Sequence, residues 1–230
     1  MKNRFFHCNS DFPYIEKWLI SIVVFLITSA PSLAQDHIKT EAHNPPHQNT
    51  QIHQKLLSLA ENGDRDAQFN LGRIYLQGKG IRQDYQTARR WFMRAAEKED
   101  AGAQYNLGNI YENGLGIQPD CKQALYWYKK AAAKSYAPAQ YALGTLYSKG
   151  CGVAQNPYRA TEWFLKAAEN GIPEAQFQMG YRYSTGLGIQ YNRDKAYEWL
   201  IKAAKQENKS AIHFLENKFN KPLLKTRALP

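Results

Sequence analysis

Paired glycines are the residues of this chain whose type and spacing most directly suggest a chemical role, the binding of phosphate. Gly78-Lys79-Gly80 has the composition of a phosphate-binding loop, in which glycines let backbone N–H groups approach a phosphate and a lysine neutralises it. That chemistry needs a strand before the loop and a helix that points its N-terminus at the ligand. The same pair returns as Gly114 and Gly116, Gly150 and Gly152, and Gly186 and Gly188. Such recurrence favours a structural connector over a phosphate site.

Histidines gather near the start of the chain, together with Asp36 and Glu41: His37, His43, His47 and His53. Histidine-rich tracts can bind metals, but no spacing here fits one helix face or a zinc finger. Residues 35–51 are polar and aperiodic, and they include Pro45-Pro46, so they bury too little surface to offset the entropy of ordering. We predict a disordered His-rich linker over 35–51, and neither a metal site nor a cofactor.

Catalytic motifs are missing from the sequence. It contains no Ser-x-x-Lys, Ser-Asp-Asn, Lys-Thr-Gly or His-Glu-x-x-His. His213 is the only histidine of residues 64–219, which leaves it without a second histidine for acid–base work. We therefore predict that the protein is not an enzyme.

Cys121 and Cys151 are the cysteines that follow the apolar N-terminal segment, and an even count permits one disulfide in an oxidising compartment. Both are expected in or beside loops on the same edge of the fold. A disulfide needs Cα atoms within about 7 Å of each other, which adjacent loops can miss. The sequence leaves open whether this possible disulfide forms.

These side chains belong to a sequence repeat of 36 residues that occurs four times. Each recurring residue returns 36, 72 and 108 positions later; the first copies are Ala67-Gln68, Gly72, Tyr75, Gly78, Gly80, Trp91 and Ala95-Ala96. Self-similarity at this period indicates a solenoid, in which each unit buries its apolar face against its neighbours.

Two helices are predicted in each repeat. In the second repeat Ala103, Leu107 and Tyr111 form one helical stripe, and Gly108 beside it implies a crossing too close for a side chain. The second helices begin at strong N-cap residues: Asp84, Asp120, Asn156 and Asn192. We predict an all-α superhelix with repeats at 64–100, 101–136, 137–172 and 173–208. A capping helix at 52–63 precedes them, and a capping helix with a basic tail follows at 209–230.

Residues 1–34 have the features of a secretory signal peptide. An apolar run at 18–30 follows Lys17 and spans roughly 20 Å as a helix, less than a hydrocarbon core of about 30 Å. Ser32-Leu33-Ala34 then forms a small-x-small cleavage site. The segment before the run is long, so an uncleaved inner-membrane anchor is the alternative. Both put the repeats outside the cytoplasm, and we expect a periplasmic or secreted protein.

The repeat resembles a known family. The pattern Ala-x-Ala-Gln-aromatic-x-Leu-Gly-x-x-Tyr-x-x-Gly-x-Gly-Ile, followed by Lys-Ala-x-x-Trp-aromatic-x-Lys-Ala-Ala, is similar to the Sel-one-like repeat (SLR), a relative of the tetratricopeptide repeat (TPR). The resemblance covers roughly residues 52–219. It implies a right-handed, TPR-like superhelix whose first helices line the concave side, and an adaptor that assembles protein complexes. A cysteine-rich branch of the family, labelled as β-lactam- or peptidoglycan-binding hydrolases, supplies the alternative function, but its regular cysteine pairing is absent here.

Comparison of the four repeats points to one face of the first helices. Positions 66, 70, 73 and 77 and their equivalents vary, while the packed stripe hardly does, and their spacing puts them on one side. The candidate partner-binding residues are Asn70, Arg73, Gln77, Asn106, Asn109, Asn113, Thr145, Lys149, Gln178 and Tyr181. Amides can donate to and accept from a peptide backbone. A face without packing constraints can also drift to any soluble residue; the resemblance to groove-binding repeats favours binding of a protein or peptide.

Basic residues offer a second surface, in a chain of net charge +10. Arg94, Lys130, Lys166 and Lys202 recur along the second helices, but acidic residues interleave with them, which favours a solvated face. The C-terminal region is more basic, with Lys205, Lys209, Lys218, Lys221, Lys225 and Arg227 against Glu207 and Glu216. An exported protein does not meet chromosomal DNA, so we expect no nucleic acid partner, anionic envelope components as ligands of the tail, and a monomer.

Overall fold

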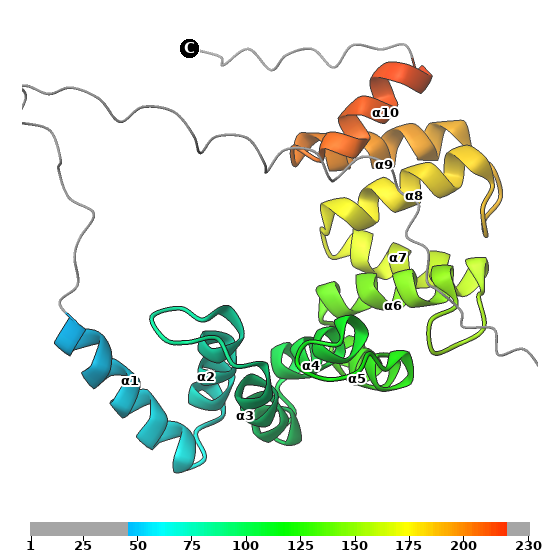
Figure 1. The fold of residues 1–230 in the computed structure, drawn as a ribbon. Coiled ribbons are helices and arrows are strands. Elements are labelled where there is room, and N and C mark those ends of the chain that lie inside the picture. Colours follow the sequence, from blue (N-terminus) through cyan, green and yellow to red (C-terminus); the bar gives the residue numbers. More distant parts are fainter. Residues whose placement is uncertain (1–45, 220–230) are drawn as a thin grey trace, which may run out of the picture. The chain divides into compact units, whose positions relative to one another are not determined.

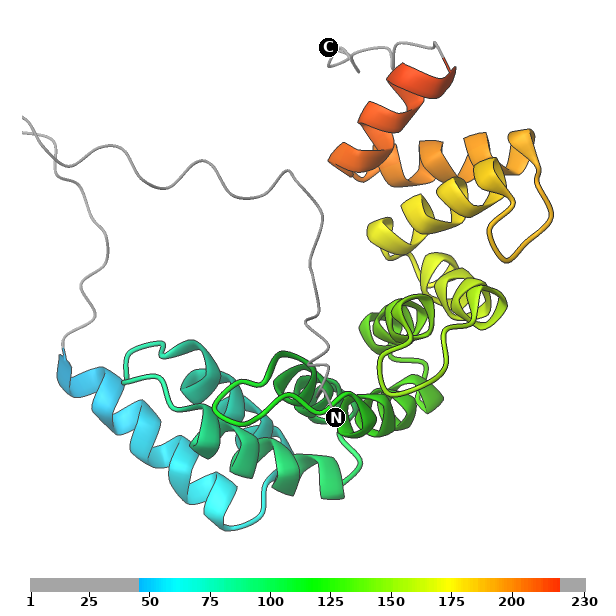
Figure 2. The same cartoon turned by 45° about the vertical axis from the view of Figure 1, so that its right-hand side comes forward.

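This computed structural model describes residues 46–219, which form ten α-helices joined by turns and loops (Figure 1). They are α1 Pro46–Glu61, α2 Arg65–Gln77, α3 Tyr85–Glu97, α4 Ala101–Asn113, α5 Cys121–Ala133, α6 Ala137–Lys149, α7 Pro157–Glu169, α8 Pro173–Thr185, α9 Arg193–Lys205 and α10 Lys209–Phe219. Each helix packs against the next one in the chain, and Figure 2 shows the same succession from a second direction. The predicted all-α repeat solenoid is confirmed.

The N-terminal capping helix differs from its predicted bounds. α1 begins at Pro46, so residues 46–51 are helical and do not belong to a disordered linker. Proline suits the first turn of a helix because its missing N–H would have no partner there, and no glycine or second proline follows it to break the helix. The signal peptide at 1–34, the rest of the linker and the tail at 220–230 lie outside the described residues.

The predicted second-helix caps are confirmed at all four sites. Asp84 accepts from the N–H groups of Gln86 and Thr87, and Asp120 does the same for Lys122 and Gln123. Asn156 and Asn192 cap α7 and α9 by accepting from one N–H each, that of Arg159 and that of Lys195. Side chains that accept these unpaired N–H groups fix where each second helix starts.

Glycine inside each first helix permits the close crossing that the sequence predicts. A Cβ added at Gly108 would lie 2.5 Å from the ring of Tyr128. A Cβ added at the equivalent glycine of the other repeats would lie as close to a side chain of the second helix: Phe92 for Gly72, Phe164 for Gly144 and Leu200 for Gly180. Because a methyl group cannot occupy that space, these glycines are required for the close packing of the two helices of each repeat.

Buried glutamines connect one repeat to the next. Gln68 donates to the carbonyl oxygen of Ala60 at 2.9 Å, Gln104 to that of Ala96 at 3.3 Å, and Gln176 to that of Ala168 at 3.2 Å. Each carbonyl lies at the end of the preceding second helix, where helical partners run out. The recurring glutamine therefore links neighbouring helical units at three of the four positions, whereas Gln140 accepts from Asn170 of its own repeat at 2.9 Å.

Repeat junctions differ in what joins their loops. At the second junction, between the second and third repeats, Cys121 at the start of α5 forms a disulfide with Cys151 in the α6–α7 loop, with Cα atoms 5.4 Å apart. At the third junction Pro157 and Leu187 occupy the equivalent positions, and the guanidinium of Arg182 donates to both of their carbonyl oxygens. At the first junction Tyr85 lies against the loop at Gly116, with no disulfide or ion pair between those two segments; the ion pair between these repeats joins Lys134 to Glu99 at 2.9 Å, near the ends of α5 and α3.

Candidate functional site

The ten candidate residues lie on α2, α4, α6 and α8, and we call them the first-helix face. Six are exposed: Asn70, Arg73, Gln77, Asn113, Lys149 and Tyr181. The other four, Asn106, Asn109, Thr145 and Gln178, are half-buried. All ten are therefore accessible at least in part, although three of the five in the second and third repeats are more buried than their spacing predicts.

Some of these polar groups already bond to their own helix. Asn106 donates to the carbonyl oxygen of Gly102 at 2.8 Å, and Thr145 donates to that of Tyr141 at 3.2 Å. Asn113 donates to the side-chain oxygen of Asn109 at 2.6 Å. Local bonds of this type are a common use of Asn and Thr within helices, and they lower the capacity left for a partner.

Other groups of the face keep their hydrogen-bonding capacity. Asn70, Gln77 and Gln178 form no hydrogen bond with the described part of the chain, and Arg73 lies over the ring of Phe69 with its guanidinium 5.8 Å from the centroid. These residues offer amide donors, amide acceptors and one cation. Asn70 and Gln77 are therefore better candidates for hydrogen bonds to a partner than Asn106 and Asn109.

Basic residues of the second helices are paired with the recurring tryptophans. Their charged groups lie over the rings three residues earlier, at 4.7 Å for Arg94 on Trp91, 5.4 Å for Lys130 on Trp127, 4.4 Å for Lys166 on Trp163 and 4.2 Å for Lys202 on Trp199. Such contacts are cation–π interactions, and the stems cover apolar surface. This arrangement accounts for the basic series without a polyanionic ligand.

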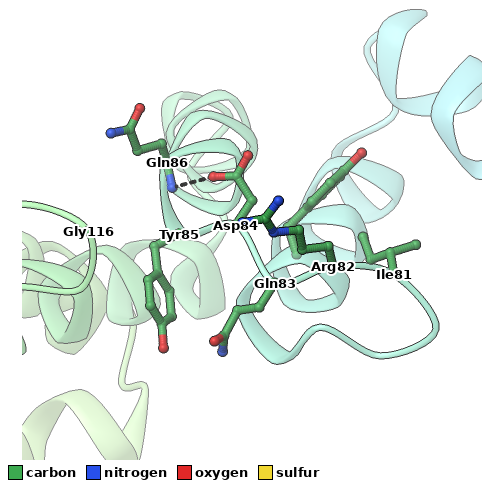
Figure 3. A pocket seen from close by; sticks show the side chains of 8 residues that line it. Ile81, Arg82, Gln83, Asp84, Tyr85, Gln86 and Gly116 are labelled. Carbon is green, nitrogen blue, oxygen red and sulfur yellow. Dashed lines mark hydrogen bonds between the residues drawn. The ribbon is translucent and has the colours of Figure 1, made fainter.

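A cavity of about 620 Å³ opens at the first junction, where no disulfide or arginine joins the loops. Figure 3 shows Arg82, Asp84 and Tyr85 along its lining, with Gly116 of the next loop opposite. The carboxylate of Asp84 is occupied as the α3 cap, and the hydrogen bonds from the side chain and the N–H of Thr87 hold its pKa below the ordinary value. An ionised cap that already accepts hydrogen bonds from Gln86 and Thr87 is poorly placed to act as a general base.

A second cavity, of about 500 Å³, lies between α8, the α8–α9 loop and α10. Its lining contains Tyr181 of the first-helix face, and also Tyr191, Arg193, Phe214 and Phe219, which the sequence reasoning did not select. Comparison of repeats could have found two of them. Tyr191 occupies the position of Gln83 and Gln155, and Phe214 of α10 lies 36 residues after Gln178, at the position equivalent to that variable residue.

Titratable groups of the described residues do not assemble into a reactive centre. No cluster of His, Cys, Asp and Glu within residues 46–219 could hold a metal ion. His53 packs edge-on against Tyr75, and His213 contacts Asn217 on the exposed side of α10. Burial raises the pKa of the Tyr128 hydroxyl, which donates to Glu112 at 2.7 Å and stays protonated.

Arg182 is the most deeply buried charge of the described chain, with 1% of its surface exposed. Burial lowers the pKa of its guanidinium, and its partners are Pro157, Leu187, Thr161 and Ser148, all through neutral oxygens. The equivalent residues of the other repeats are Ile74, Ile110 and Leu146. It joins the start of α7 to the α8–α9 loop and is closed off from solvent.

Among curated proteins none matches this chain. The Sel1 repeat family model matches four consecutive segments, residues 65–100, 101–136, 137–172 and 173–208. No helix within residues 46–219 is long and apolar enough to span a bilayer.

Solved structures with the same architecture include two at substantial identity. A protective antigen of uropathogenic Escherichia coli strains, c5321, displays an SLR fold and is 39% identical over 71% of this chain, with a TM-score of 0.68. A Sel1 repeat protein from Oxalobacter formigenes is 35% identical over 72%, with a TM-score of 0.66. This chain covers only 36% and 48% of those two proteins. The immunity protein Pa5087 of Pseudomonas aeruginosa is 23% identical over 78% of this chain and 65% of its own, with a TM-score of 0.50, which shows a shared fold alone.

Proposed function

We propose that this chain, which belongs to the Sel1 repeat family, is a scaffold and that its first-helix face binds a protein or peptide. Proteins of this family are generally scaffolds for protein–protein interactions. One observation carries the assignment of the face. The packed positions of the first helices hardly change between repeats, whereas the positions beside them vary, and among these Asn70 and Gln77 are exposed and keep unused hydrogen-bonding groups. The family resemblance puts this face on the concave side.

The hydrolase alternative is not supported. The cysteine-rich branch joins the two helices of each repeat by a disulfide, whereas the disulfide here joins two successive repeats. The hydroxyl of Thr87 donates to the carboxylate of Asp84 at 2.7 Å, but that carboxylate is engaged as the α3 cap. The scaffold proposal needs no chemistry beyond binding, and we propose that the protein acts as a monomer.

Loss of the free amides is expected to abolish partner binding without unfolding the protein. The variant Asn70→Ala/Gln77→Ala/Gln178→Ala removes three side chains that make no internal hydrogen bond, so its melting temperature should match the wild type within about 2 °C. Each bond lost to a partner backbone should cost about 0.5–1.5 kcal/mol of affinity. Affinity capture with the mature protein as bait measures partner retention.

A matched control changes three exposed residues of the second helices. Glu97→Ala/Lys129→Ala/Glu162→Ala should retain the partner, because these side chains are exposed on the other helices of the repeats. If this control loses the partner while the amide variant keeps it, recognition lies on the second helices and the assignment of the face is wrong.

We also propose that the repeats are exported, to the periplasm or beyond. The Cys121–Cys151 disulfide supports this because disulfides persist in oxidising compartments. The basic tail, whose residues Lys221, Lys225 and Arg227 lie outside the described residues, would then meet anionic envelope components.

Export predicts a new amino terminus. Cleavage after Ser32-Leu33-Ala34 should leave Gln35 first, since the apolar run is too short to span a bilayer comfortably. Intact-mass measurement of protein from the envelope fraction should give the mass of residues 35–230. Recovery of the Met1 terminus in membrane pellets would favour the signal anchor.

A further inference from the structure

The cavity of about 500 Å³ at the C-terminal end of the repeats combines aromatic walls with positive charge. Its walls are Tyr181 of α8, Tyr191 of the α8–α9 loop, and Phe214 and Phe219 of α10. Phe214 meets Tyr181 edge-on, with ring centroids 6.0 Å apart. A cavity of this size admits one apolar or aromatic side chain with its backbone.

Exposed aromatics at this place are a departure from the repeat pattern. Tyr191 is 60% exposed and Tyr181 is 39% exposed. In the first and third repeats the position of Tyr191 holds a glutamine that closes its loop, since Gln83 donates to Leu76 at 2.7 Å and Gln155 to Ser148 at 2.8 Å. The second repeat has Pro119 at this position, and the fourth has a solvent-facing ring that packing of the repeat does not require.

Charge around this cavity has a single sign. Arg193 and Lys218 are part of the lining, and no carboxylate is. Arg193 is the first residue of α9, where the helix dipole disfavours a cation, so helix stability does not explain it. Its guanidinium lies 5.6 Å from the centroid of Phe219 and forms no ion pair with the described part of the chain. Both cations are exposed and keep their donors for a ligand.

The hydroxyl groups of the cavity add donors. Ser184 and Thr185 already donate to the carbonyl oxygen of Tyr181, at 2.8 and 2.9 Å. The hydroxyls of Tyr181 and Tyr191 form no hydrogen bond with residues 46–219. A lining of free donors and cations between aromatic rings matches a ligand that carries both an apolar side chain and a carboxylate.

We propose that this cavity binds an acidic peptide segment, with an apolar or aromatic side chain between the rings and a neighbouring carboxylate held by Arg193 and Lys218. The inference rests on the proposed scaffold function and gives its partner a chemistry. A basic segment is disfavoured by charge, and that includes the protein's own tail, in which Lys221, Lys225 and Arg227 carry the same sign as the cavity.

Isothermal titration of the mature protein with three short synthetic peptides tests the proposal. The probes are N-acetylated and C-amidated Gly-Asp-Phe-Glu-Gly, Gly-Lys-Phe-Lys-Gly and Gly-Asp-Ala-Glu-Gly. The first should bind, with an affinity that falls as salt rises, and the other two should bind at least about tenfold more weakly, since each lacks one of the two recognised groups. Absence of binding by the first peptide, or equal binding of the lysine peptide, overturns the proposal.

Two variants keep the result specific to the cavity. Tyr191→Gln introduces the residue that closes the loop in the first and third repeats, so it should fold normally and bind the acidic peptide at least about fivefold more weakly. Arg193→Gln/Lys218→Gln should lower the affinity at least about tenfold. Its control, Lys205→Gln/Lys209→Gln, removes the same charge outside the cavity and should bind as the wild type does; an equal loss in the control would show general electrostatic attraction and overturn the site.

Failure of this proposal can be told apart from failure of the scaffold function. A partner that is retained by the Arg193→Gln/Lys218→Gln variant and lost by the variant at Asn70, Gln77 and Gln178 would leave the scaffold function standing and remove the cavity from it. Loss with the cavity variant, together with weaker binding of the acidic peptide, supports both.

Discussion

Replacing Trp127 with alanine is expected to destabilise the protein by about 3–5 kcal/mol, the usual cost of truncating a buried tryptophan. Only 8% of its surface is exposed, and it packs with Ala95, Ala96, Ala103 and Leu107. Those residues belong to the end of α3 and to α4, so the ring fills the space between the first and second repeats. Loss of the ring therefore removes a contact on which two repeats depend.

Chemical denaturation followed by far-UV circular dichroism measures this effect, and a fall of about 10 °C in melting temperature should accompany it. Because solenoid stability is a sum of nearest-neighbour terms, the loss should spread to the adjoining repeats. Lys129→Ala is the control, since Lys129 lies two residues further along the same helix, is exposed, and should change stability by no more than about 0.5 kcal/mol. Equal stability of Trp127→Ala and Lys129→Ala would place the ring outside the core.

Recurrence inside the sequence was enough to predict the fold, because each recurring residue has one local physical role. Asp84 and its equivalents could be recognised as caps from their type alone. Gly108 could be recognised as a close crossing because a glycine inside a helix is costly unless space requires it. The start of α1 was predicted too late because the polar composition of residues 46–51 was taken to mean disorder, whereas these residues extend the capping helix from Pro46, which is tolerated in a first helical turn.

The candidate site was less predictable, because periodicity gives the direction of a side chain but not its depth or its local bonds. Asn106 has the same helical position as Asn70, yet Asn106 is half-buried and donates to Gly102. The cavity beside Tyr181 depends on how α10 packs against α8, and a contact between separate helices has no signature in the period. Only the departures at Tyr191 and Phe214 hinted at it.

The disulfide shows the same limit, since its geometry depends on the rotation between successive repeats. That rotation brings the start of α5 against the Gly-x-Gly loop of the next repeat, with the backbone of Cys121 beside Gly152. A side chain at Gly152 would collide with that backbone, so the second glycine of the motif is what lets Cys121 and Cys151 approach to a Cα distance of 5.4 Å. The close approach recurs at Gly188 and Pro157, where cysteines are absent.

Removing this disulfide is expected to cost about 3–4 kcal/mol. The two cysteines are separated by 30 residues, and the chain-entropy model assigns about that free energy to a closed loop of this length. Cys121→Ser/Cys151→Ser should melt below the wild type, and reduction of the wild type with dithiothreitol should reproduce the shift. Reductant should not change the double-serine variant, which is the control. Two alkylated thiols in protein that was never reduced would contradict the bond.

The loss should also be local. The third junction uses Arg182 between Pro157 and Leu187 in place of a disulfide, and reduction leaves those hydrogen bonds intact. Hydrogen exchange after reduction should therefore accelerate in α5 and α6, which flank the second junction, and change little in α8 and α9. Uniform acceleration across all repeats would mean that the disulfide stabilises the solenoid as one cooperative unit, and that the junctions do not act independently.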